Sequence, residues 1–206
     1  NPRTGLIISF EGDKQIEKWA FTYDQALAAI AYANFSDLSR AKEILDFYNN
    51  KAQRKDGLFL NAYYSDDGLP AEYIMHSGPN IWLGIAIMQY TKLSKDDKYV
   101  ALAQEIARQI LAIQARDPDG GICGGPGISW FSTEHNLDAY AFFNMLYKYT
   151  NDAKYLAAKD RTLAWLVKNT YNSTDVPVKR GRGDSTIATD TYAWSIAAIG
   201  PEKLRA

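Results

Sequence analysis

An all-α fold is predicted by three features of the sequence: helical segments that repeat at a fixed spacing, an alternation between two kinds of helix, and a composition that supplies a large apolar core. The 206 residues are 47% hydrophobic, 13% aromatic and 23% charged, which is typical of one globular domain and excludes a disordered or fibrous chain. We therefore expect residues 1–206 to form a single domain.

The repeat has a period of 56 residues. The tetrapeptide Lys-Tyr-Val-Ala at 98–101 returns as Lys-Tyr-Leu-Ala at 154–157, and the same shift in the other direction falls on Lys-Glu-Ile-Leu at 42–45. A fixed period of this length indicates stacked or circularly arranged units. Each unit contains two helices of different character.

The first helix of each unit is apolar on nearly every side, as in Ile-Trp-Leu-Gly-Ile-Ala-Ile-Met at 81–88, and such a helix is buried all round. The second helix has apolar residues at helical spacing between Lys, Glu, Arg and Gln, and therefore has one wet face. The predicted first helices are 23–33, 79–93, 134–149 and 189–199, and the predicted second helices are 38–53, 97–114 and 153–169.

Two concentric layers produce this alternation, because an inner helix touches neighbours on all sides and an outer helix meets water on one. The sequence therefore predicts an α/α toroid of about seven main helices. A solenoid of TPR-like repeats is the alternative, but its units are nearer 34 residues and its helices are alike in polarity.

The charge balance and the apolar runs exclude several partners. Lys and Arg number 23 against 24 Asp and Glu, a net charge of −1, so no overall field attracts nucleic acid or an acidic membrane. No apolar run approaches the roughly 20 residues that span a bilayer. Cys123 is alone, which excludes an internal disulfide. The chain begins at Asn1 without a Met, as a trimmed protein does. A secreted or periplasmic location is favoured over the cytoplasm. The oligomeric state stays open.

The connections after the outer helices are long. Residues 54–78, 116–133 and 168–188 exceed the roughly 12–15 residues beyond which a structureless loop usually carries function. Each connection enters an inner helix at its N-terminus, so all three emerge on one side. We expect the polar motifs at these helix starts to meet in one shared cleft. Their carboxylates and aromatic rings suit a sugar, which offers hydroxyls to the former and an apolar C–H face to the latter.

Three motifs carry a resemblance to a known superfamily: Thr-Tyr-Asp-Gln-Ala-Leu at 22–27, Ser-Thr-Glu-His-Asn-Leu-Asp-Ala-Tyr at 132–140, and Asp-Thr-Tyr-Ala-Trp at 190–194. With them the chain resembles the six-hairpin α/α toroid glycosidases and their lyase and epimerase relatives. The resemblance implies a carbohydrate-active enzyme that acts on an oligo- or polysaccharide without a cofactor. Fewer helices are predicted than six hairpins supply, so we expect an incomplete ring that is truncated at its C-terminal end.

Paired carboxylates are the candidates for catalysis, because glycoside hydrolysis needs one acid to protonate the leaving oxygen and one carboxylate to act as base or nucleophile. Glu134 and Asp138 lie four residues apart, hence on one helical face, and Asp24 and Asp190 would face them across the cleft. Helix capping is the alternative role for Glu134, Asp24 and Asp190. Asp138 lies too deep in an apolar helix to cap it and must find a partner or a wet cavity, so it is the strongest single candidate.

Aromatic and polar side chains near the same helix starts are the candidates for substrate binding. The two histidines could transfer protons or be held by structural hydrogen bonds, and Trp82 could equally belong to the core. The histidines and the cysteine lack the spacing of zinc ligands, so no metal is expected. The substrate-binding candidates are Tyr23, Glu72, His76, Asn80, Trp82, Trp130, His135, Tyr192 and Trp194.

Three functions are compatible with these residues. A glycoside hydrolase with paired carboxylates is favoured. A lyase or epimerase acting on uronic acids would use His135 or a tyrosine as base, and the loop Arg180–Arg182 to neutralise the substrate carboxylate. A non-catalytic helical-repeat scaffold would bind glycan or peptide without breaking a bond.

Overall fold

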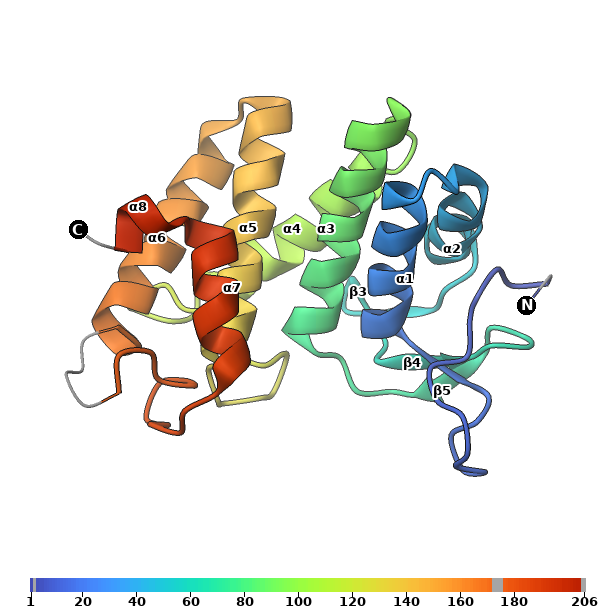
Figure 1. Cartoon of the computed structure of the whole chain (residues 1–206), viewed down its shortest axis with the longest axis horizontal. Coiled ribbons are helices and arrows are strands. Elements are labelled where there is room, and N and C mark those ends of the chain that lie inside the picture. Colours follow the sequence, from blue (N-terminus) through green and yellow to red (C-terminus); the bar gives the residue numbers. More distant parts are fainter. Residues whose placement is uncertain (2, 172–175, 205–206) are drawn as a thin grey trace. The chain divides into compact units, whose positions relative to one another are not determined.

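The computed structural model describes residues 1, 3–171 and 176–204 (Figure 1). The all-α prediction is confirmed, because helices make up most of the described chain and the strands are short. Contacts group the residues into two compact units, Asn1–Ala107 and Arg108–Ala206.

In the first unit, helices α1 (Thr22–Asn34) and α3 (Ser77–Ser94) pack side by side, and α2 (Leu38–Asn50) packs against both (Figure 1). Helix α4 (Val100–Gln114) begins in this unit. The small side chains of Ala26, Ala29 and Ala33 form one buried stripe along α1, because residues three or four apart share a helical face. This stripe lets the neighbouring helices approach α1 closely.

In the second unit, α5 (Thr133–Thr150) packs against α6 (Ala153–Asn169) and α7 (Thr189–Ile199), and the short α8 (Pro201–Leu204) follows. The bounds of α6 and α7 are those predicted from the sequence. The core of this unit is a cluster of buried side chains from three helices: Leu137, Tyr140, Trp165, Leu166 and Ile199.

The 56-residue repeat is visible in individual hydrogen bonds. Lys95 and Asn151, one period apart, follow α3 and α5 in the left-handed conformation, with φ of 63° and 55°. The N–H of Lys95 donates to the carbonyl of Thr91 at 3.0 Å, and that of Asn151 donates to Tyr147 at 2.8 Å. A left-handed residue is a common helix terminator, and here it recurs one period apart at the ends of α3 and α5.

Short strands occupy segments in which the sequence predicted no helix. Three form an antiparallel sheet in the order β1-β4-β5, namely β1 (Trp19–Phe21), β4 (Ala62–Tyr64) and β5 (Pro70–Glu72). The other two, β2 (Arg54–Lys55) and β3 (Leu58–Phe59), form a hairpin.

The hairpin explains why the second helix ends at Asn50 instead of residue 53. Its turn residues Asp56 and Gly57 have φ of 51° and 80°, and a tight two-residue turn needs positive φ at both positions. The dipeptide Asp-Gly at 56–57 favours such a turn. The fourth helix also differs slightly from expectation, since it begins at Val100 rather than at residue 97.

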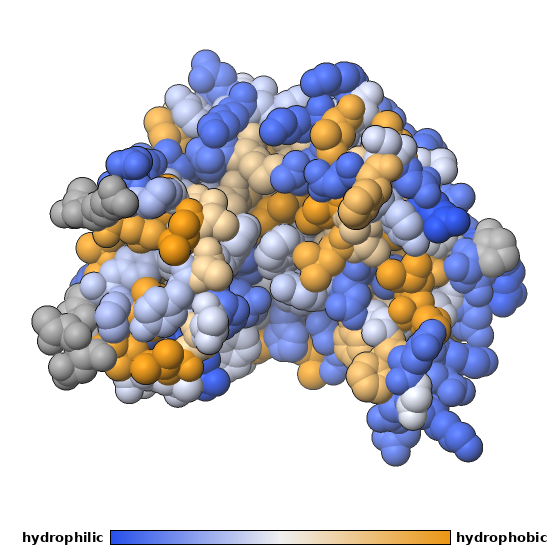
Figure 2. Space-filling view, viewed as in Figure 1, coloured by the Kyte–Doolittle hydropathy of each residue, from blue (hydrophilic) through white to orange (hydrophobic). Residues whose placement is uncertain are grey.

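Apolar surface remains exposed in both units, where Figure 2 shows hydrophobic and hydrophilic side chains interspersed. Its most exposed large members include Phe35, Ile187 and Tyr73. Scattered apolar residues of this kind are usual on protein surfaces. Among the described helices, none is both long and apolar enough to cross a lipid bilayer.

Candidate functional site

The first residue of α5 ties that helix to a distant loop. The backbone N–H of Thr133 donates to the carbonyl of Arg180 at 2.8 Å, and its hydroxyl donates to the carbonyl of Lys179. Thr22, the first residue of α1, does the same in the other unit: its N–H donates to Asn61 at 2.8 Å and its hydroxyl to Leu60 at 2.6 Å. Each of these helix N-termini is therefore held beside a long loop.

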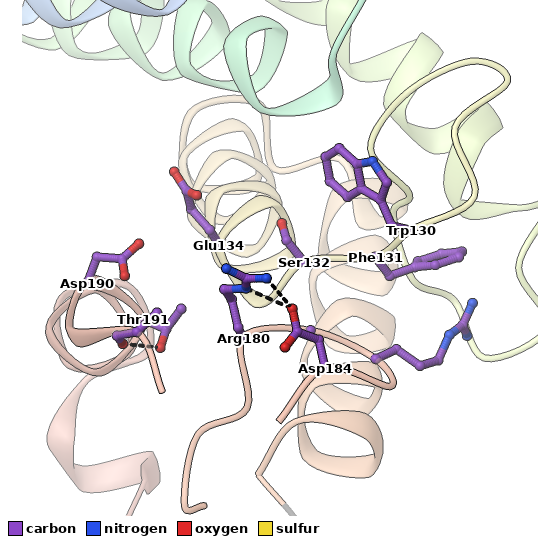
Figure 3. A pocket seen from close by; sticks show the side chains of 11 residues that line it. Trp130, Phe131, Ser132, Glu134, Arg180, Asp184, Asp190 and Thr191 are labelled. Atoms are coloured by element: carbon purple, nitrogen blue, oxygen red, sulfur yellow. Dashed lines mark hydrogen bonds and ion pairs between the residues drawn. The ribbon is translucent and has the colours of Figure 1, made fainter. Parts of the chain in front are cut away.

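This arrangement creates a cleft of about 640 Å³ in the second unit. Its walls are the first turns of α5 and α7 and the loop around residues 180–184. Figure 3 shows the carboxylates of Glu134 and Asp190 and the guanidinium of Arg180 around one opening. The side chains that line it include Trp130, Phe131, Ser132, Glu134, Arg180, Asp184, Asp190 and Thr191.

Glu134 and Asp190 are the two predicted catalytic carboxylates that the cleft brings together. Glu134 is half-buried in the first turn of α5, and Asp190 is exposed in the first turn of α7. Burial raises the pKa of the Glu134 carboxyl above its ordinary value, and the negative charge of Asp190 raises it further. The pair thus consists of a partly desolvated carboxyl, Glu134, which keeps its proton to a higher pH than usual, and an exposed carboxyl, Asp190.

Asp138 lies elsewhere. It is fully buried one turn further along α5, and it is not among the residues that line the cleft. The indole Nε1–H of Trp194 donates to its Oδ1 at 2.7 Å. The partner that this buried carboxylate needed is therefore a side chain of α7.

The aromatic wall of the cleft is Trp130, whose side chain remains 49% exposed. Its ring lies 5.2 Å from that of His135, measured between centroids. A Cβ on Gly124 would come within 2.5 Å of the Trp130 ring, so only glycine lets the ring fold down here. Tyr192, another predicted binding residue, instead lines a separate apolar groove with Val167 and Ile196.

The remaining predicted residues lie in the first unit. Asp24 is half-buried in the first turn of α1, and the rings of Tyr23 and Trp82 make an edge contact at 5.7 Å. Convergence of the two groups in one shared cleft stays a prediction.

Glu72 and His76 meet at Asn61, a residue that the sequence did not single out. The Asn61 amide donates to the Glu72 carboxylate, and its carbonyl lies 3.4 Å from Nδ1 of His76. An Asn side chain in an extended loop gives no sequence signal for such a contact.

Asn80 has a structural position. Its side chain is fully buried, its Oδ1 accepts from the N–H of Phe59 at 2.8 Å, and its Nδ2 donates to the carbonyls of Phe59 and His76. Both amide hydrogens are therefore used within the protein. Asn80 clamps a backbone segment instead of facing a ligand.

Comparison with known proteins gives the fold. No protein-family model matches the chain, and no curated protein matches its sequence. A D-mannose isomerase structure matches with a TM-score of 0.72 at 19% identity, over 88% of this chain and 55% of that one. The structure of a sugar epimerase from a ruminal bacterium matches with a TM-score of 0.69 at 17% identity, over 97% of this chain and 60% of that one. The structure of a GH76 alpha-mannanase from Bacteroides thetaiotaomicron matches with a TM-score of 0.66 at 17% identity, over 96% of this chain and 63% of that one.

The chain has the six-hairpin α/α toroid fold. The predicted fold class is thereby confirmed, and the TPR-like alternative is not needed. The chain spans a little over half the length of the isomerase and the epimerase. In this toroid fold the cleft of the second unit lies at the N-termini of two inner helices, α5 and α7.

The loop Arg180–Arg182 was a predicted candidate for binding a substrate carboxylate, but the ion pairs that its arginines make were not predicted. Arg180 pairs with Asp184 through Nε at 2.7 Å and Nη2 at 2.6 Å, and both side chains line the cleft. Arg182 also lines the cleft, but its guanidinium pairs with the buried Asp117 at 2.9 Å and lies 3.7 Å from the centre of the Phe131 ring. The sequence showed the basic run but not the acidic partner of each arginine.

Within the described part of the chain, no cluster of three or more His, Cys, Asp or Glu side chains is placed to bind a metal ion. The polar side chains of the cleft are carboxylates, hydroxyls and the guanidinium groups of Arg180 and Arg182. Such a set can exchange a proton with a ligand and bind its hydroxyl groups.

Proposed function

We propose that the chain forms part of a carbohydrate-processing enzyme that hydrolyses glycosidic bonds in the cleft of the second unit. Glu134 is the proton donor to the leaving oxygen, and Asp190 is the carboxylate that activates water or attacks the sugar. Hydrolysis with either stereochemical outcome requires such a pair. Asp24 remains a further candidate carboxylate from the first unit.

The observation that carries this proposal is the difference between the two carboxyls. A general acid must hold its proton at the working pH, and both burial and the charge of Asp190 raise the pKa of Glu134. Asp190 is exposed and therefore well hydrated in its charged form. Two carboxyl groups in unlike surroundings are the usual arrangement for acid and base roles.

The rest of the cleft supports a sugar as substrate. The exposed face of Trp130 can stack on the apolar C–H face of a sugar ring, and the polar groups of Ser132 and Asp184 can bind its hydroxyls. The solved structures with this fold include proteins named as a mannose isomerase, a sugar epimerase and a mannanase. An oligo- or polysaccharide is accordingly the proposed partner.

The test is to incubate the full chain with neutral gluco- and manno-oligosaccharides and with uronate-containing oligosaccharides, and to measure new reducing ends. We expect Glu134→Gln and Asp190→Asn each to lower turnover by about 10²–10⁴-fold, which is the usual contribution of a positioned acid or base. Glu202→Gln and Asp160→Asn are matched controls, because both residues are exposed in the same unit and lie outside the cleft. Cleavage that survives Glu134→Gln would remove the proposed acid.

Action on an acidic sugar is the second candidate, favoured by the position of Arg180 in the cleft wall. A lyase or epimerase would take a proton from carbon with a base such as His135, which contacts the Trp130 ring. Elimination gives an unsaturated product that absorbs ultraviolet light, and hydrolysis does not. Saccharide binding with neither reaction would indicate a non-catalytic scaffold.

A further inference from the structure

We propose that Asp138 and Trp194 are positioning residues that hold Asp190 at its place opposite Glu134. This inference rests on the proposed function of the cleft. It gives Asp138, the strongest catalytic candidate from the sequence, a different role.

The spacing along the two helices is the first step. Glu134 and Asp138 are four residues apart on α5, and Asp190 and Trp194 are four residues apart on α7. Because residues four apart lie on one helical face, Asp138 lies one turn below Glu134 on α5, and Trp194 lies one turn below Asp190 on α7. The two helices pack against each other. The hydrogen bond between Asp138 and Trp194 therefore links α5 to α7 beneath the cleft, and we call this link the rung.

The strength of the rung is the second step. The donor and acceptor atoms are 2.7 Å apart, Asp138 is fully buried, and Trp194 is partly buried. A hydrogen bond to a buried carboxyl oxygen is costly to break, because the oxygen loses that donor where water cannot replace it. Sliding or rotating α7 against α5 would break this bond.

The anchoring of Trp194 is the third step. Its ring packs against the buried cluster that includes Leu137, Trp165 and Ile199. The same side chain is therefore fixed by apolar packing on its ring and by Asp138 on its nitrogen. The start of α7, including Asp190, inherits its position from these contacts.

The chemical consequence concerns Glu134. The charge of Asp190 contributes to the raised pKa of the Glu134 carboxyl, and that contribution falls as the two groups separate. If the rung holds α7 in place, breaking it must lower the titration midpoint of Glu134. A purely structural role elsewhere in the fold would lower stability without moving this midpoint.

The test is a titration of the Glu134 side-chain carboxyl by 13C NMR in the full chain, which needs no substrate. Trp194→Phe removes the N–H donor and keeps an aromatic ring, and Asp138→Leu removes the acceptor. We expect the midpoint to fall by about half a pH unit in both. Asp138→Asn keeps an acceptor oxygen for the indole and is expected to preserve the wild-type midpoint. Lys203→Met, which removes the 3.0 Å bond from Lys203 to Tyr140 of α5, is the control that should leave it unchanged.

An unchanged midpoint in folded Trp194→Phe would overturn the proposal, and so would an Asp138→Asn midpoint that moves as far as that of Trp194→Phe. If Asp138→Leu fails to fold, Trp194→Phe and Asp138→Asn still decide the question. Turnover separates the remaining roles: loss of more than about a hundredfold in Asp138→Asn with an unchanged Glu134 midpoint would make Asp138 catalytic instead. Because the titration needs no substrate, a failure of the hydrolase proposal would appear only in the cleavage assay.

Discussion

Asn136, in the first turn of α5, binds both backbone polar groups of Ile122. The N–H of Ile122 donates to Oδ1 of Asn136 at 2.9 Å, and Nδ2 of Asn136 donates back to the Ile122 carbonyl at 3.0 Å. Asn80 holds Phe59 in the same way one period earlier, and Gln25 holds Ile7 with distances of 3.0 and 2.9 Å. An amide side chain mimics a neighbouring strand at these three positions and fixes a loop against an inner helix.

Replacing Asn136 by Ala should therefore destabilise the protein strongly. The backbone N–H and C=O of Ile122 are buried with it, and each would lose its partner at a cost of about 1–3 kcal/mol. We expect the free energy of unfolding to fall by about 2–4 kcal/mol in urea denaturation. Asn50→Ala, at an exposed position, is the control and should change it by less than about 0.5 kcal/mol. Equal effects of the two substitutions would contradict the clamp.

Glu134→Gln should raise stability at neutral pH while it lowers activity. The folded protein raises the pKa of Glu134 above its ordinary 4.5, so the folded state holds this proton more tightly than the unfolded chain does. Stability from this group is then present at low pH and is lost as the pH rises through that range. Glutamine cannot ionise, so the variant should exceed the wild type in thermal midpoint at pH 7 and match it near pH 3. A Glu134→Gln variant that is less stable than wild type at pH 7 would show that ionised Glu134 does not destabilise the folded protein.

Asp46 should make the opposite contribution. Burial opposes ionisation of this carboxyl, but hydrogen bonds from Lys42, Lys98 and Tyr99 outweigh it and lower its pKa from 3.8 to about 2. The stabilisation is therefore complete above the ordinary pKa and is lost as the pH falls through about 2. We expect Asp46→Asn to cost about 1–2 kcal/mol at pH 7, after allowance for solvent screening. The difference from wild type should shrink in urea denaturation at pH 2.

Gly181→Ala should disturb the cleft wall. A Cβ at this position would lie 2.3 Å from the backbone oxygen of Phe131, and backbone cannot move aside as a side chain can. We expect a loss of more than about 2 kcal/mol in stability together with weaker saccharide binding. Gly183→Ala is the comparison, since it has φ of 79° but no atom within 4 Å of the added Cβ. Its cost should be limited to about 1–2 kcal/mol of backbone strain, with binding retained.

Local chemistry explains why so much of the fold could be predicted. The apolar pattern of a helix predicts how far it is buried, as in the continuous apolar run 81–88 of α3. A repeat shows the same pattern again, so it can be recognised without any knowledge of tertiary contacts. The predicted ends of the two inner helices at 93 and 149 lie one period apart, and the structure ends them at Ser94 and Thr150. The strands were missed because they contain two or three residues each, too few for a period of two to stand out.

The site was predictable only in part, for a different reason. Glu134 and Asp190 could be selected because a carboxyl at a helix start on the loop side must face that end of the fold. Asn80 shared their placement, but its role depended on a loop backbone that lies 21 residues away in sequence. No pattern in a single chain distinguishes an amide that binds a ligand from one that binds the backbone.

The sequence by itself determined the helical repeat and the alternation between two kinds of helix, because these follow from the periodicity of apolar side chains. Only the tertiary structure decided that Asp138 meets Trp194, that Arg180 pairs with Asp184 and that Arg182 pairs with Asp117. Those partnerships depend on the path of long loops. That path is set by hydrogen bonds between distant segments, such as Thr133 with Arg180, which leave no periodic trace in the chain.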